Sequence, residues 1–301
     1  MAGGGRSVRE LRVALPESFR RGDLIRYWGR DARSAQEKTS ADGIEWALRS
    51  PSGDSVRVEV AFRADVARAT IDAGPTGSAP DAATVSWAEA VVPRMLGLHL
   101  DPGAFEGALL GGVHRRLIKD KLGLSIPQTA TVFDGALWVI CGQQVSLPVA
   151  FSLRRRLAER FGVRLGELYA PPRPADLVDI DPDVLFGLGL SRRKTEYLQG
   201  FCRLIVDGFD PEALRGAPAD DVEQRLLAIR GFGPWSVNYL LMRALGDADR
   251  VPVGDAGLAR ALVRYFDLDR RPDASETRRL MATFAPHRSL ATFHMWASFA
   301  G

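Results

Sequence analysis

Two glycines and a proline form the first pattern in the sequence that could do chemistry. Gly231 and Gly233 are separated by one residue and are followed by Pro234, between two segments with helical spacing of apolar residues. Glycine readily ends a helix and proline fits the first turn of the next one, so the sequence predicts two helices joined by a tight turn. Because these glycines have no side chains, the N–H groups of the turn could bind a phosphate. An ordinary helical hairpin without a ligand fits the same pattern.

Asp255 is the carboxylate with the most informative setting. It follows Pro252 and Gly254, and it lies 24 residues (255 minus 231) after the first hairpin glycine. An aspartate in front of an amphipathic segment suits the N-cap of a helix, which is its simplest role. A fixed negative charge could also stabilise a cation that forms during a reaction, or orient an attacking water molecule. The two roles are compatible.

The sequence around these residues resembles that of a known family. Residues 229–239 resemble the helix-hairpin-helix of DNA glycosylases and are most similar to the bacterial 3-methyladenine DNA glycosylase II family. Residues 250–258 resemble that family's connection to its essential aspartate. Three further segments agree in the same order along the chain: Ile140–Ser146, Leu188–Lys194 and Phe284–Ala291. The resemblance implies a DNA glycosylase of base excision repair.

The resemblance also implies roles for four side chains around the reaction. Asp255 is the expected catalytic carboxylate, because cleavage of an N-glycosidic bond leaves positive charge on the deoxyribose. The damaged base must be rotated out of the duplex and stacked in a pocket. Trp235 and Tyr239 lie on one face of the second hairpin helix, where most such pairs are core residues, and they are expected in this pocket. Phe284 is expected there too, at a position where close relatives tend to carry tryptophan.

Contacts with DNA are expected from two other places. By resemblance, Gly231 and Gly233 contact the DNA backbone, while Gln143 and Gln144 lie at the corner that fills the gap left by the flipped base. Gln144 is the residue expected to enter that gap. The simpler interpretation of the two glutamines is a polar helix boundary. The basic runs Arg154–Arg156 and Arg192–Lys194 are expected to be solvated helix faces.

Several types of chemistry are excluded or not expected. Bifunctional relatives carry a lysine early in the second hairpin helix, but this chain has Pro234–Val237 there, so a Schiff base is not expected. The two cysteines, Cys141 and Cys202, cannot supply the four ligands of the iron–sulfur relatives, and they are expected to be reduced core residues. The histidines have no metal-ligand spacing. The sequence therefore predicts a monofunctional enzyme without a cofactor or metal.

The elements that must position these residues fall into two regions. In residues 1–100, the alternation of apolar residues over 55–63 predicts a half-buried strand, and residues 51–54 suit a hairpin turn from a preceding strand. From residue 101 onward, helical segments follow one another, one of them predicted over 105–122. The expected fold class is α+β: an amino-terminal α+β domain with an antiparallel sheet (1–100), then an all-α helix-hairpin-helix glycosylase region (101–301) whose two helical halves flank the active-site cleft. Asp220 and Glu223 resemble a capping box for the first hairpin helix.

Composition sets the class of protein. The 301 residues are 46% hydrophobic, with a formal charge of +3 and a pI near 9.1, as in a globular protein compatible with an anionic partner. The chain has no apolar run of the roughly 18 residues that span a bilayer, and no secretory signal is recognised. We expect a cytoplasmic protein, associated with the nucleoid in a bacterium. The expected partner is double-stranded DNA containing damaged bases, with no membrane and no obligatory protein partner.

Two other functions fit part of the sequence. A non-catalytic helix-hairpin-helix protein could bind DNA or sense damage, but it would need neither Asp255 nor the aromatic pair. A glycosylase for oxidised or deaminated purines would need both, and the sequence leaves this alternative open. The favoured prediction is hydrolysis of the glycosidic bond of alkylated purines, which leaves an abasic site.

Overall fold

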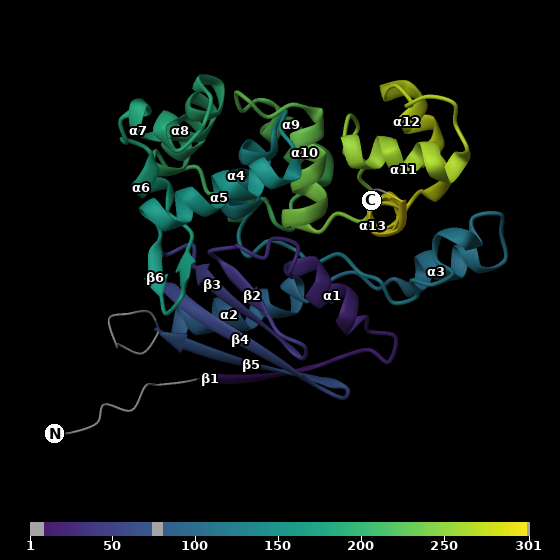
Figure 1. The fold of residues 1–301 in the computed structure, drawn as a ribbon, viewed down its shortest axis with the longest axis horizontal. Helices are drawn as coiled ribbons and strands as arrows, with labels where there is room; N and C mark the ends of the chain where they lie inside the picture. Colours follow the sequence, from purple (N-terminus) through teal and green to yellow (C-terminus); the bar gives the residue numbers. More distant parts are fainter. Residues whose placement is uncertain (1–8, 74–80, 300–301) are drawn as a thin grey trace. The chain divides into compact units, whose positions relative to one another are not determined.

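The computed structural model of the chain describes residues 9–73 and 81–299. The chain forms two compact units, which we describe one at a time. The first contains residues 1–17, 21–95 and 130–212, and the second contains residues 18–20, 96–129 and 213–301. Their elements are labelled in Figure 1. The domain boundary predicted at residue 100 stays a prediction. Within the described ranges, no helix is long and apolar enough to cross a membrane.

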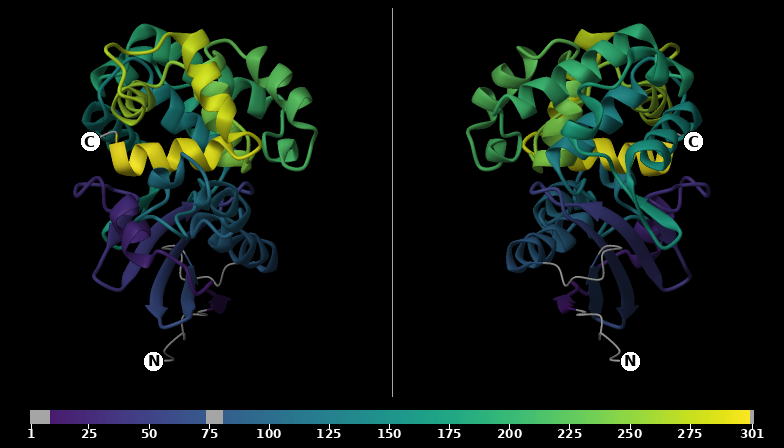
Figure 2. Two further views of the ribbon diagram at one scale, coloured as in Figure 1. Left: turned by 90° about the vertical axis from the view of Figure 1, so that its right-hand side faces the viewer. Right: turned by 90° about the vertical axis from the view of Figure 1, so that its left-hand side faces the viewer.

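The first unit contains a five-stranded antiparallel sheet in the order β1-β5-β4-β3-β2, which Figure 2 shows from two further directions. Its strands are β1 (Arg9–Ala14), β2 (Glu37–Thr39), β3 (Gly43–Arg49), β4 (Ser55–Arg63) and β5 (Val66–Ala73). The alternation predicted over residues 55–63 is confirmed, because Val56, Val58, Val60 and Phe62 are 0 to 1% exposed. The predicted turn joins β3 to β4, and within it Gly53 has a φ of 100°.

Helices and a small hairpin complete the first unit. Helix α1 (Arg21–Trp28) contacts β2 and β3, whereas α2 (Ala82–Met95) contacts β1 and β5. The remaining helices are α4 (Val132–Gly142), α5 (Leu147–Phe161), α6 (Pro174–Leu177), α7 (Pro182–Gly187) and α8 (Arg192–Val206). The sequence did not predict the strands β6 (Val163–Leu165) and β7 (Leu168–Ala170), because three residues are too few to show an alternation. They pack on Ala47 of β3.

An ion cluster connects the sheet to the helices of this unit. The guanidinium of Arg154 in α5 donates to the Glu37 carboxylate of β2 at 3.0 Å, and it lies 3.6 Å from the Asp134 carboxylate of α4. The Arg154 side chain is only 13% exposed. The prediction of a solvated arginine run is therefore wrong for Arg154, because two carboxylates distant in sequence compensate the buried charge.

The second unit is helical in its described part. It contains α3 (Gly103–Leu110), α9 (Ala219–Leu227), α10 (Pro234–Leu240), α11 (Ala256–Phe266), α12 (Ala274–Met281) and α13 (Arg288–Phe299). Helix α11 packs against α13 and buries Leu258, Leu262 and Tyr265 along one face. The single helix predicted over residues 105–122 is wrong: α3 ends at Leu110, and only a 3-10 turn, η1 (Arg115–Leu117), follows. Gly111 and Gly112 separate the two, since glycine weakens a helix.

The sheet of the amino-terminal region and the helices that follow it confirm the predicted α+β fold class. The five strands of the sheet lie within residues 9–73, and in the described residues from 132 onward the helices are interrupted only by the short strands β6 and β7. This organisation places every candidate site residue named from the sequence in the helical part of the chain.

Candidate active site

The two hairpin glycines lie between α9 and α10, as the sequence predicts. Gly231 has a φ of 95°, a left-handed conformation that glycine adopts without the steric cost of a side chain. Gly233 is the N-cap of α10, and a Cβ atom on it would meet no atom within 4 Å. The buried side chains of Ile229 and Phe232 anchor the turn. Open space around Gly233 is what a close approach to a phosphate requires.

The predicted capping box of the first hairpin helix is wrong. The N-cap of α9 is Pro218, and no side chain caps the helix. Asp220 instead lies within the first turn, together with Asp221, where negative charge favours the helix N-terminus, and Glu223 lies one turn further into the helix. The Glu223 carboxylate accepts a hydrogen bond from Arg250 at 2.6 Å, so a long-range partner has taken the place of the local one.

Asp255 caps α11 at the end of a tight turn. Its backbone N–H donates to the carbonyl of Pro252 at 3.0 Å, and Gly254 inside the turn has a φ of 91°. The carboxylate oxygen Oδ1 accepts from the N–H of Leu258 at 2.7 Å, so the expected N-cap is present. The cap fixes one oxygen of the carboxylate at the positive end of a helix.

Two indole groups also bind this carboxylate. The Nε1 group of Trp235 in α10 donates to Oδ2 at 3.2 Å, and the Nε1 group of Trp296 in α13 donates to Oδ1 at 3.0 Å. With Leu258, three donors from three helices therefore hold the Asp255 side chain. An indole N–H and a backbone N–H can only donate, so all three groups suit the ionised carboxylate. Such a fixed negative charge can stabilise a neighbouring cation.

The two indole rings that bind the carboxylate share an aromatic neighbour, Tyr239. The ring centroids of Trp235 and Tyr239 lie 5.7 Å apart, and those of Tyr239 and Trp296 lie 6.1 Å apart. Tyr239 is buried, whereas the two tryptophans are half-buried. The structure therefore brings Asp255, Trp235 and Tyr239 together, and it adds Trp296. Nothing in the local sequence marks Trp296, because an aromatic residue in an amphipathic helix usually belongs to the core.

Phe284 lies elsewhere in the second unit. It belongs to the 3-10 turn η4 (Ala282–Phe284), is 3% exposed, and packs against His114 with ring centroids 4.8 Å apart. Its other aromatic neighbour is Tyr265, at the opposite end of α11 from Asp255. The structure does not bring Phe284 to the aromatic group around the carboxylate, and its role in a base pocket stays a prediction.

The two glutamines form a corner at the end of α4 in the first unit. Gln143 is the C-cap of α4, and the exposed Gln144 has a φ of 54°, which is rare for a residue with a side chain. The Lys194 amine donates to the carbonyl oxygen of Cys141 at 2.6 Å, in the last turn of α4. Lys194 is buried, so its predicted place on a solvated face is wrong, and burial lowers the pKa of this amine. A cation at the negative end of α4 stabilises the corner.

The cysteines and one histidine, which are residue types that can bind metals, are buried in the protein. Cys141 and Cys202 are buried free thiols, as predicted, and burial raises the pKa of each to about 12. His294 is buried and its pKa is lowered to about 4, chiefly by burial. Among residues 9–73 and 81–299, no group of three histidine, cysteine, aspartate or glutamate side chains could hold a metal ion.

Comparison with known proteins assigns the chain to a family. Residues 137–287, which are half of the chain, match the family described as HhH-GPD superfamily base excision DNA repair protein. The chain belongs to this superfamily. The match contains the Gln143–Gln144 corner, the glycine hairpin and Asp255. The predicted resemblance to helix-hairpin-helix glycosylases is therefore confirmed.

Individual relatives are similar to the chain over part of their length. The DNA-3-methyladenine glycosylase of Bacillus subtilis (strain 168) is 31% identical over 179 residues, 58% of this chain and 59% of the relative. DNA-3-methyladenine glycosylase 2 of Escherichia coli (strain K12) is 29% identical over 215 residues, 69% of this chain and 70% of the relative. The first two curated relatives are matched over 59% and 64% of their lengths, so the chain spans about three fifths of them.

A solved structure shares the fold. The 3-methyladenine DNA-glycosylase from Archaeoglobus fulgidus superposes with a TM-score of 0.81, covering 95% of this chain and 97% of that chain. Its sequence is 20% identical. The likeness therefore concerns the arrangement of the strands and helices.

Proposed function

We propose that this chain is a monofunctional DNA glycosylase that hydrolyses the N-glycosidic bond of alkylated purines in double-stranded DNA and leaves an abasic site. The observation that carries the proposal is the Asp255 carboxylate, held by two indole N–H groups and a helix N-terminus in the midst of aromatic rings. Membership of the HhH-GPD superfamily and relatives named DNA-3-methyladenine glycosylase support it.

The chemistry follows from the charge of that carboxylate. As the glycosidic bond breaks, positive charge develops on the deoxyribose ring, and the fixed anion of Asp255 stabilises it. The same carboxylate can orient the water molecule that adds to the sugar. Since its three hydrogen-bond partners hold it before the substrate arrives, little reorganisation is needed during the reaction.

Recognition of the base rests on the aromatic rings. A base rotated out of the duplex needs flat surfaces on which to stack, and the half-buried rings of Trp235 and Trp296 offer them beside Asp255, with the buried ring of Tyr239 next to both. An alkylated purine such as 3-methyladenine is cationic, so π-faces and a nearby carboxylate both favour it. A panel of duplexes with alkylated, oxidised or deaminated purines tests this choice of substrate by the base released from each.

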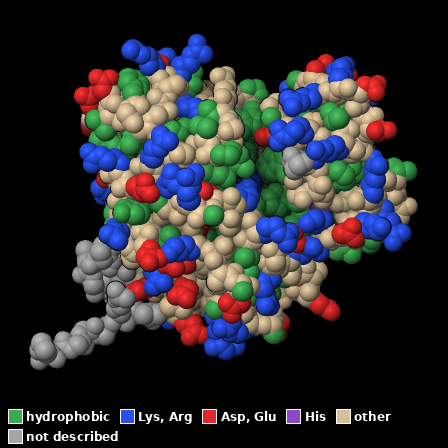
Figure 3. Space-filling model, in the orientation of Figure 1, with side chains coloured by type: hydrophobic (Ala, Val, Ile, Leu, Met, Phe, Trp, Pro, Cys, Tyr) green, Lys and Arg blue, Asp and Glu red, His purple; other side chains and the backbone are tan. Residues whose placement is uncertain are grey.

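The proposed grip on DNA is local. On the face drawn in Figure 3, basic and acidic side chains are interspersed, and the whole chain has a formal charge of only +3. The hairpin at Gly231 and Gly233 would therefore contribute a backbone phosphate contact, and the exposed Gln144 would fill the gap left by the base.

We propose a protein of the bacterial cytoplasm that needs no protein partner for this reaction.

Asp255→Asn tests the proposed reaction. Asparagine has one oxygen acceptor for three donors, so the variant should fold with a loss of about 1 kcal/mol in unfolding free energy. Its single-turnover rate of base release should fall by about 100-fold or more, because the negative charge is lost. Asp273→Asn is the matched control, since Asp273 caps α12 through Glu276 N–H at 2.9 Å and binds no indole.

The control variant should lose similar stability and keep the parental rate. Single-turnover conditions are needed because slow release of the abasic product would mask the chemical step. Base release at the parental rate by folded Asp255→Asn would leave Asp255 as a helix cap only, and the reaction would need another group. A parent that binds DNA but releases no base from any duplex would favour the non-catalytic alternative.

A further inference from the structure

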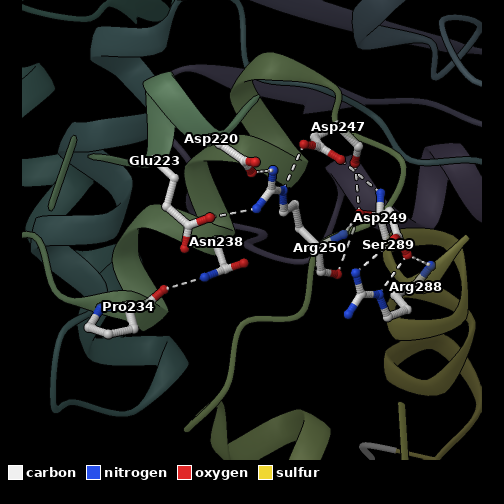
Figure 4. Close-up of polar contacts among 9 residues, drawn as sticks. All are labelled: Asp220, Glu223, Pro234, Asn238, Asp247, Asp249, Arg250, Arg288 and Ser289. Carbon is white, nitrogen blue, oxygen red and sulfur yellow. Dashed lines mark hydrogen bonds and ion pairs between the residues drawn. The ribbon is translucent and has the colours of Figure 1, made fainter. Parts of the chain in front are cut away.

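A short segment before Asp255 is fixed on both of its sides. On one side, the Arg250 guanidinium donates to the carboxylate of Glu223 in α9 at 2.6 Å and to that of Asp247 at 2.7 Å (Figure 4). The Arg250 side chain is 15% exposed, so water screens these ion pairs only in part. Arg250 therefore ties the segment to the first hairpin helix.

On the other side, the segment is bound to the start of α13. The Arg288 guanidinium donates to both carboxylate oxygens of Asp249, at 2.6 and 2.7 Å. The Ser289 hydroxyl accepts from the N–H of Arg250 at 2.9 Å and donates to the carbonyl of Asp247 at 2.7 Å (Figure 4). We call the group of Glu223, Asp247, Asp249, Arg250, Arg288 and Ser289 the 247–250 clamp.

The 247–250 clamp connects an element of the hairpin with an element that binds the carboxylate. Helix α9 leads into the Gly231 turn, and α13 carries Trp296, which donates to Asp255. Only four residues separate Arg250 from Asp255 in the chain. The turn from Pro252 to Asp255 is closed by a backbone hydrogen bond of 3.0 Å. Such a short and closed connection can transmit a displacement of Arg250 to the carboxylate.

We propose that Arg250 is a positioning residue that couples the first hairpin helix to Asp255. The clamp holds three parts of the site in one geometry: the helix that leads into the glycine hairpin, the catalytic carboxylate and the α13 tryptophan. The effect on base excision rests on the proposed function, whereas the effect on the geometry of Asp255 does not. Arg250 does not touch the carboxylate, so its role differs from that of Asp255 itself.

The test uses two variants of the link and one control. Arg250→Met removes the guanidinium, and Glu223→Gln weakens its shortest bond to α9, while its contacts with Asp247 and, at 3.8 Å, with the exposed Asp220 of α9 stay. Arg270→Met is the control, because Arg270 also pairs with a carboxylate at 2.7 Å, that of Glu276, outside the clamp. Arg250→Lys keeps the charge with fewer donors and should restore part of any loss.

The main readout is the pair of indole N–H groups that bind Asp255. In full-length protein labelled with nitrogen-15 tryptophan, Arg250→Met should shift the Trp235 and Trp296 indole resonances and accelerate their hydrogen exchange by about tenfold. The single-turnover rate should fall by about tenfold, since a small misplacement of a catalytic group is costly. Glu223→Gln should move both readouts in the same direction by less, and Arg270→Met should move neither.

The outcomes separate the clamp from general stability and from the proposed reaction. Faster exchange confined to the two indoles and the amide of Leu258 supports positioning, whereas equal acceleration at slow amides throughout the unit overturns it. Unchanged indole signals in folded Arg250→Met overturn it as well, whatever the excision rate. If Arg250→Met does not fold, Glu223→Gln decides by the same criterion. A parent without base release would refute the proposed function and leave the indole test intact.

Discussion

The indole N–H of Trp296 donates to Oδ1 of Asp255 at 3.0 Å, across 41 residues of chain. The same oxygen accepts from the N–H of Leu258 at 2.7 Å, so it is saturated by two donors that fix the carboxylate plane. Oδ2 accepts from Trp235 alone among the described residues. Trp296 therefore orients the carboxylate and, at the same time, presents a ring next to Tyr239.

Trp296→Phe should separate these two contributions, because phenylalanine keeps an aromatic face and removes the donor. We expect the single-turnover rate to fall by about tenfold, since Asp255 loses one of the three groups that orient it. Trp87→Phe is the matched control, since Trp87 lies in α2 of the other unit. A rate equal to that of the parent would show that the cap and Trp235 suffice to hold the carboxylate.

Gly257→Ala should slow the reaction without unfolding the protein. A Cβ atom there would lie 3.1 Å from Oδ1 of Asp255 and 3.4 Å from the Trp296 indole, so the carboxylate or the ring must move. Alanine is the better helix former by about 1 kcal/mol, which should offset the cost in stability. Gly200→Ala in α8, where a Cβ meets nothing within 4 Å, should raise stability and keep the parental rate. Equal rates for both variants would argue that Asp255 tolerates movement.

Local patterns were the parts of the structure that the sequence could predict. The strand over residues 55–63, the turn at Gly231 and Gly233 and the N-cap at Asp255 each depend on residues a few positions apart. Period, turn chemistry and capping preferences act at that range. The family resemblance then placed Asp255 and the aromatic pair in one site, and the structure brings these three residues together.

Long-range partners explain what the sequence could not predict. Glu223 fits a local capping box in sequence, but Arg250, 27 residues away, binds its carboxylate. Lys194 belongs to a basic run that predicts a solvated face, but its amine donates a hydrogen bond to the carbonyl of Cys141, 53 residues away. Trp296 has no local signal for the same reason. The helix predicted over 105–122 is a different case, because the Gly111–Gly112 pair that follows α3 is a local feature of the sequence and weakens a helix there.

Stability should fall in mild acid because of His294. Burial, and to a lesser degree the charges of Lys121 and Arg20, lower its pKa from 6.5 to about 4. The unfolded chain binds a proton below pH 6.5 while the folded chain does not, so stability is complete above that pH and is lost as the pH falls toward 4. When the pH is lowered from 7.5 to 5, protonation of His294 in the unfolded chain should reduce the free energy of unfolding by about 2 kcal/mol.

Denaturant unfolding of the parent and of His294→Leu at several pH values measures this contribution. The variant should show a smaller loss between pH 7.5 and pH 5, by about the 2 kcal/mol assigned to the imidazole. His294→Gln replaces it if the leucine variant does not fold. The pKa of His114 is also lowered by burial and by Arg116, so some acid sensitivity should persist in either variant. Identical pH dependence in parent and variant would contradict the assignment to His294.

Borohydride should trap no covalent complex between the protein and DNA. A Schiff base needs an uncharged amine beside the sugar, and α10, the second hairpin helix, contains no lysine. The Lys194 amine is buried and donates to the carbonyl of Cys141. Base excision followed by gel analysis should therefore yield intact abasic strands, cleaved only after alkali. A bifunctional glycosylase on its own lesion duplex serves as the positive control. Efficient trapping by this chain would mean that one of its four lysines or its amino terminus is a nucleophile, and the enzyme would be bifunctional.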